Sequence, residues 1–98
     1  MGKKSVKIVQ SPCGDHAIYF HTDVRLSMGT VYTSTKDVNE KTKALLTEIM
    51  GIHGVQEASI DRYKVRVERA LAVEWTEISL RVEKAIQDAV ASAGSKLE

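Results

Sequence analysis

Three residues near the N-terminus have side chains that could hold a metal ion: Cys13, His16 and His21. A thiolate and two imidazoles are ligands that zinc favours. However, residues 16–21 have a strand-like pattern, with Ile18 and Phe20 on one side and Ala17 and Tyr19 on the other, and in a strand these two histidines project to opposite faces. They therefore cannot converge on one ion. His53 is expected in a solvated turn, so the sequence predicts no metal site within one chain.

Cys13 could instead be a reactive thiol or one ligand of a shared cluster, and it is the single cysteine of the chain. Its neighbours Pro12 and Gly14 indicate a turn. Asp15 disfavours a thiolate there, whereas His16 would favour one if it packed alongside. A loop residue without a chemical role is the preferred interpretation. The alternative is a homodimer that pairs two Cys13 loops, because symmetry supplies ligands that one chain lacks.

Arg62, Lys64 and Arg66 occur at every second position of a segment rich in β-branched residues. Alternate residues of a strand share a face, so these cations, with Glu68 and Arg69, are expected to form an outward-facing ladder. Such a ladder is either ordinary solvated surface or a docking strip for an acidic protein. Arg62, Lys64 and Arg66 are therefore the predicted partner-binding residues.

The aromatic residues Tyr19, Tyr32 and Tyr63 could line a sheet face that stacks nucleic-acid bases. The chain lacks the motif of interleaved basic and aromatic residues that would make this specific. Its 14 Lys and Arg residues against 13 Asp and Glu residues give a formal charge of +1. This balance argues against nucleic acid or an anionic membrane as a partner, and sheet packing is the preferred role of the tyrosines.

The sequence contains no recognisable catalytic set. It has no Ser-His-Asp order, no paired carboxylates in a catalytic arrangement, no phosphate-binding loop and no dinucleotide-binding glycine pattern. We therefore expect a protein that is not an enzyme and that holds no cofactor.

The 98 residues, 43% of them hydrophobic, are predicted to form one domain over residues 1–98 with an ordinary apolar core. Leu97-Glu98 resembles a scar left by a purification tag and is set aside. No apolar run approaches the roughly 20 residues that span a bilayer, and no signal-peptide core is visible. The expected location is the cytoplasm.

Strand and turn patterns place β-structure in five segments. The predicted strands cover residues 6–10, 16–21, 30–33, 55–60 and 63–68. The last two flank Asp61-Arg62 as a hairpin, with Tyr63, Val65 and Val67 predicted to point inward.

Two amphipathic helices complete the pattern. Asp37 and Glu40 have the form of a capping box that starts the first helix, and Gly51 and Gly54 are candidates for its left-handed end. The second helix is predicted from Glu74 to near Gly94, with Trp75 as a core anchor. The predicted order is β-β-(β)-α-β-β-α. Paired strands favour an α+β fold, an antiparallel sheet with both helices on one face and the other face open.

Several segments resemble the N-terminal domain of Nfu-type (NifU-like) iron–sulfur scaffold proteins. The helix 44–49 leads into Ile52-His53-Gly54-Val55, which is similar to the family's Ile-Pro-Gly-Val turn with histidine in place of proline. Segment 59–67 lies where the family has a hairpin, and 74–78 resembles the acidic-Trp start of its closing helix. Val9-Gln10-Ser11-Pro12 is similar to the Gln-Thr-Pro opening, followed here by Cys13-Gly14-Asp15 instead of Pro-Asn.

The matched positions belong mostly to the core and turns, so the resemblance speaks to the fold before activity. In full-length Nfu proteins a Cys-x-x-Cys motif in a separate C-terminal domain holds the cluster, and this chain has neither. The resemblance therefore implies a non-catalytic accessory or protein-interaction module, with iron–sulfur assembly or client proteins as partners. The alternatives are metal or cluster binding by a Cys13 homodimer, and a small-ligand-binding domain with a pocket between sheet and helices.

Overall fold

The computed structural model of the chain describes residues 6–36 and 38–93. Within these residues, five strands and two helices follow one another in the predicted order. They are β1 (Ile8–Pro12), β2 (Ala17–Thr22), β3 (Thr30–Val31), α1 (Glu40–Met50), β4 (Val55–Asp61), β5 (Lys64–Arg69) and α2 (Trp75–Ala93).

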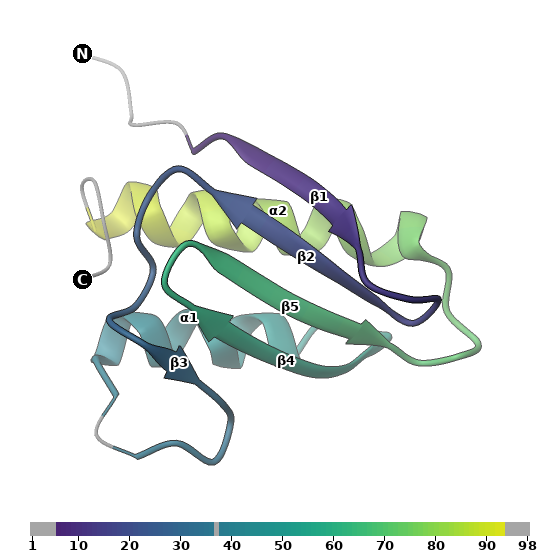
Figure 1. The fold of residues 1–98 in the computed structure, drawn as a ribbon, viewed down its shortest axis with the longest axis horizontal. Helices are drawn as coiled ribbons and strands as arrows, with labels where there is room; N and C mark the ends of the chain where they lie inside the picture. Colours follow the sequence, from purple (N-terminus) through teal and green to yellow (C-terminus); the bar gives the residue numbers. More distant parts are fainter. Residues whose placement is uncertain (1–5, 37, 94–98) are drawn as a thin grey trace.

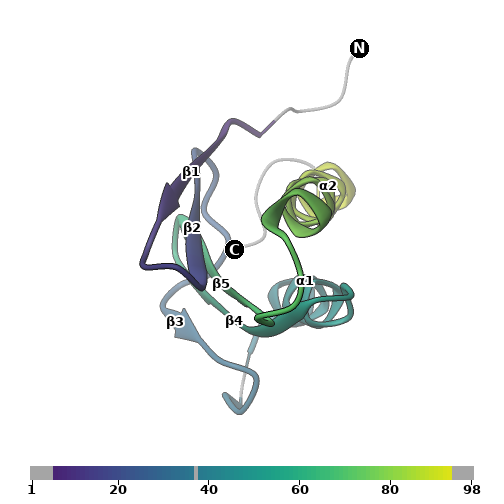
Figure 2. The same cartoon turned by 90° about the vertical axis from the view of Figure 1, so that its right-hand side faces the viewer.

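The strands form one antiparallel sheet in the order β1-β2-β5-β4-β3 (Figure 1). Two hairpins, β1–β2 and β4–β5, lie side by side and join along β2 and β5. Both helices cover the same side of the sheet, and the other side is free of them (Figure 2). The predicted α+β class, antiparallel sheet and one-sided helical layer are confirmed.

The core lies between the sheet and the two helices. It is made by the inward residues of the strands and by the apolar stripe of each helix, which the sequence pattern predicted. Its fully buried members include Phe20, Leu26, Ile49, Ile60, Val65, Val67, Ile78, Val82, Ile86 and Val90. Trp75 packs against this core while partly buried.

Strand β1 continues to Pro12, although the sequence predicted that it would end before Ser11. The Cys13 amide donates to the Ala17 carbonyl at 2.9 Å, so hydrogen bonding to β2 falls on alternate residues and skips Pro12. The missing N–H of Pro12 therefore faces away from β2, at the open edge of the sheet. Proline is tolerated in a strand at such a position.

The start of α1 differs from the predicted capping box. The N-cap is Asn39, whose side-chain oxygen accepts from the amides of Lys41 at 2.8 Å and Thr42 at 3.4 Å. Asn caps as well as Asp, and with Asn39 in this position Glu40 becomes the first helical residue and cannot complete a capping box. The predicted cap, Asp37, lies outside the described residues.

The left-handed helix end predicted at Gly51 or Gly54 is wrong, because the C-cap of α1 is Gly51 in a right-handed conformation, and Gly54 lies beyond it in the turn before β4. Gly54 has a φ of +98°, whereas Gly51 has a φ of −80° and stays right-handed. The second helix starts at Trp75, and Gly94 lies outside the described residues. In the described part of the chain, neither helix is long and apolar enough to cross a membrane.

Candidate functional site

The open face of the sheet carries two of the three predicted partner-binding residues. Lys64 and Arg66 of β5 lie opposite His21 and Tyr19 of β2 in the antiparallel register. Neighbours in register point to the same side of a sheet, and Val65 and Val67 between them are buried on the helical side. Lys64, Arg66, Tyr19 and His21 therefore form one surface, which we call the open-face patch.

Contacts within the open-face patch hold its side chains in place. The Lys64 ammonium lies 4.8 Å from the centre of the Tyr19 ring, and the Tyr19 and His21 rings are 5.9 Å apart. The Arg66 guanidinium donates to the Glu68 carboxylate. This hydrogen bond raises the pKa of Arg66 above its usual value, against the opposing effect of desolvation. The patch thus presents a guanidinium paired with a carboxylate, beside an ammonium that lies over an aromatic ring.

Arg62, the third predicted residue, lies in the turn beyond the ladder. Asp61 pairs with Lys64, which leaves Arg62 and Tyr63 as a two-residue turn. Arg62 has a φ of 57°, and its guanidinium donates to Asp61 at 2.7 Å. Its side chain is 60% exposed. The structure therefore groups Lys64 with Arg66 and places Arg62 at the tip of the same hairpin.

Tyr63 was predicted to point inward, and this prediction is wrong: the residue is 51% exposed. Alternation along β5 applies only where strand pairing continues, and the last pair is Asp61 with Lys64. Tyr63 lies in the turn beyond that pair. The chain reverses direction there, and the Tyr63 side chain points away from the core.

The loop between β2 and β3 supports this turn from the side (Figure 1). The buried Ser27 hydroxyl accepts from the Arg62 amide at 2.9 Å and donates to the Gly29 carbonyl at 2.6 Å. The Leu26 amide donates to the Arg62 carbonyl at 2.6 Å, and the Thr22 amide to the Tyr63 carbonyl at 2.7 Å. The sequence gives no sign of this support, because a serine in a loop carries no signal of a contact 35 residues away.

The residues first considered for metal binding do not converge. Cys13 lies half-buried in the β1–β2 turn, near the Arg66 guanidinium, and its proximity adds to the rise in the Arg66 pKa. His21 lies on strand β2 while His16 precedes that strand, and His53 is exposed after α1. Across residues 6–36 and 38–93, no three His, Cys, Asp or Glu side chains come together as a metal site.

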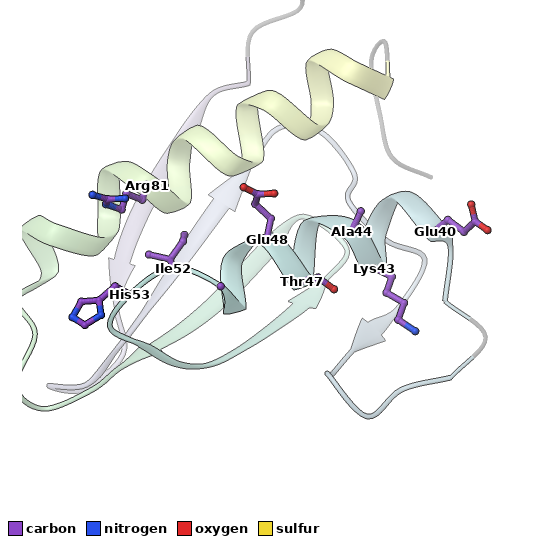
Figure 3. Close-up of a pocket in the computed structure, with 9 residues that line it drawn as sticks. Glu40, Lys43, Ala44, Thr47, Glu48, Ile52, His53 and Arg81 are labelled. Carbon is purple, nitrogen blue, oxygen red and sulfur yellow. The ribbon is translucent and has the colours of Figure 1, made fainter.

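A broad groove lies on the helical side, between α1 and α2, with a volume of about 900 Å³. Figure 3 shows Arg81 and His53 at one end and Lys43 and Glu40 at the other. Its charged residues are of both signs. A smaller hollow of about 180 Å³ lies between α1 and the chain that follows β3. Neither hollow contains a predicted partner-binding residue.

Comparison with known proteins gives likeness in structure and none in sequence. No family model matches the chain, and no curated protein matches it. The solution structure of a NifU-like protein from Saccharomyces cerevisiae is similar with a TM-score of 0.72 and 13% identity, over 97% of this chain and 87% of that one. The crystal structure of protein SAV1430 from Staphylococcus aureus is similar with a TM-score of 0.62 and 20% identity, over 82% of this chain and 98% of that one.

These likenesses bear on the fold alone. The chain has the fold of a NifU-like protein, which agrees with the coarser part of the resemblance drawn from its sequence. The narrower resemblance, to the N-terminal domain of Nfu proteins, stays a prediction.

Proposed function

We propose that this chain is a non-catalytic protein-interaction module of the cytoplasm, an accessory domain of the NifU-like kind that binds an acidic surface on iron–sulfur assembly or client proteins. The observation that carries the proposal is the open-face patch. Lys64, Arg66 and Tyr19 lie together on the side of the sheet that neither helix covers.

The chemistry of the patch suits an acidic protein. A guanidinium binds a carboxylate through two parallel hydrogen bonds, and a tyrosine ring adds apolar contact area at little cost in conformational entropy. Arg66 already contacts Glu68, but both side chains are about one-third exposed. Exposed ion pairs contribute little to stability, so Arg66 can exchange Glu68 for a partner carboxylate at small cost.

A matched pair of double variants tests the proposal. Lys64→Gln/Arg66→Gln removes two positive charges from the open face, whereas Lys41→Gln/Lys43→Gln removes two from exposed positions on α1. Crosslinking in the native cell, followed by mass spectrometry, compares the partners of each variant with those of the natural chain. We expect the open-face variant to lose partners that the α1 variant keeps. Equal partner sets for both variants contradict the proposal.

We also propose that the isolated chain does not scaffold an iron–sulfur cluster, because it contains a single cysteine. Anaerobic reconstitution with iron and sulfide should leave no stoichiometric cluster on the purified protein. A cluster that forms on a dimer and disappears in Cys13→Ser contradicts this and supports the Cys13 homodimer instead.

A further inference from the structure

We propose that the turn between β4 and β5 is a rigid anchor for an acidic peptide segment that carries an apolar side chain next to its carboxylate. The surface consists of Arg62, Tyr63 and Met28, and we call it the turn surface. This inference rests on the proposed function, because it names where on the hairpin the partner is held most tightly and what segment it must present.

The backbone of Arg62 has an unusual conformation. Among the described residues, Arg62 is the one residue other than glycine with a positive φ. A positive φ at the first of two turn residues, but not at the second, is the sign pattern of a type II′ turn, and that position favours glycine. An unfavourable backbone conformation indicates a function for the side chain it displays.

Hydrogen bonds to the loop between β2 and β3 make the turn rigid. The main-chain N–H and C=O of Arg62 are both engaged, by the Ser27 hydroxyl and the Leu26 amide. The Tyr63 carbonyl accepts from both the amide and the hydroxyl of Thr22. Ser27 is fully buried. A surface fixed in this way loses little conformational entropy when it binds, which favours affinity.

The turn surface exposes large side chains to solvent. Tyr63 is 51% exposed and Met28 is 63% exposed. Met28 directly follows Ser27, whose hydroxyl accepts from the Arg62 amide, so the chain at Met28 runs close to the turn. Arginine, tyrosine and methionine are enriched in protein interfaces, and truncating arginine or tyrosine there often causes large losses of affinity.

The charge of the turn residues determines which partner the turn surface can bind. Residues 61–64 contain Arg62 and Lys64 against the single carboxylate of Asp61. The Arg62 side chain is 60% exposed at the tip of the hairpin, so its guanidinium is the cation that this surface offers to a partner. The Arg62–Asp61 contact is solvent-exposed and exchanges readily for a partner carboxylate. The turn surface therefore fits a carboxylate beside an aliphatic or aromatic side chain.

The probe is a random peptide library displayed on phage, selected against the full chain. We expect the enriched peptides to combine acidic residues with an apolar neighbour. Calorimetric titration with a synthetic copy of the best peptide should show about tenfold weaker binding to Arg62→Gly and to Met28→Ser. Leu80→Ser is the matched control, because Leu80 is an apolar residue 73% exposed on α2, and it should bind normally.

Arg62→Gly separates binding from folding, because glycine relieves the backbone and should raise the melting temperature while it weakens binding. Unchanged affinity in Arg62→Gly, or enriched peptides without acidic residues, overturns the inference. If Lys64→Gln/Arg66→Gln abolishes peptide binding while Arg62→Gly preserves it, the open-face proposal stands and the turn surface is wrong. If the open-face double variant binds the peptide normally while Arg62→Gly fails, the turn surface binds without the open-face patch.

Discussion

At the scale of single residues, Arg62 should reduce stability through its backbone. A left-handed conformation costs a residue with a Cβ about 1–2 kcal/mol, and glycine is largely free of this cost. We expect Arg62→Gly to raise the free energy of unfolding by about 1 kcal/mol, measured by urea denaturation. Arg62→Ala keeps the Cβ and should give no such gain. A gain of the same size in Arg62→Ala would mean that the guanidinium, and not the backbone, is the unfavourable part.

Gly54 is the opposite case, a glycine that the fold requires. A Cβ built on Gly54 would lie 2.5 Å from Val73 Cγ1, and the residue has a φ of +98°. We expect Gly54→Ala to lower the free energy of unfolding by about 2–4 kcal/mol, from overpacking and backbone strain together. Gly29→Ala is the control, because a Cβ there meets nothing within 4 Å. Equal losses in both variants would contradict this explanation.

Sequence alone could not predict the turn surface. The alternation that correctly placed Val65 and Val67 inward extends on paper to Tyr63, because a side-chain period of two does not reveal where strand pairing stops. Arg62 carries no sign of its positive φ, since two-residue hairpins usually use glycine or asparagine there. Gly54 does have a positive φ, but it serves the turn before β4 and not the helix end that the sequence pattern suggested.

At the scale of elements, a buried hydrogen bond joins α1 to the loop between β2 and β3. The Thr42 hydroxyl donates to the Leu26 carbonyl at 2.6 Å, and Thr42 is fully buried. Thr42→Val preserves the shape but removes the donor, so we expect a loss of about 1–3 kcal/mol in the free energy of unfolding. Thr47→Val, at an exposed position of the same helix, should change it by less than about 0.5 kcal/mol. Chemical denaturation of both variants distinguishes them.

The existence and type of the elements followed from pattern, and their ends did not. The helical patterns were long enough to be unambiguous, so two amphipathic helices on one face of the sheet were predicted correctly. At the start of α1, Asp37 and Asn39 are both good caps, and only the folded geometry selects Asn39. Pro12 was predicted to end its strand. A strand tolerates proline where the missing N–H faces an open edge of the sheet, and the strand order, not the local sequence, determines whether a strand lies at an edge.

At the scale of the whole molecule the formal charge is only +1, so an acidic peptide is attracted by local cations and not by the overall field. Binding of the selected acidic peptide should therefore weaken as the salt concentration rises. Salt screens the attraction between exposed charges, with a screening length of about 8 Å at physiological ionic strength. Calorimetric titrations at low and high salt check this. Lys64→Gln should show a shallower salt dependence, since it removes one cation near the turn. A salt-independent affinity would mean that apolar contact alone holds the peptide.

The NifU-like fold could be inferred from this sequence at an identity of only 13% because folds depend on the pattern of buried positions more than on residue identity. Partner recognition depends on exposed side chains, which the core pattern leaves unconstrained. The outward placement of Lys64 and Arg66 was predictable because strand alternation puts them on one face. The position of Met28 near Arg62 was not, since it comes from a loop contact.

The joining of the two hairpins along β2 and β5 sets the order in which this chain can fold. Each hairpin closes locally, within about 1–10 μs, whereas the pairing of β2 with β5 closes a long loop that contains β3, α1 and β4. That closure carries an entropy cost before any central pairing repays it. We therefore expect the meeting of β2 with β5 to limit the folding rate, so that the open-face patch, which spans this seam, is completed only in the final, cooperative step.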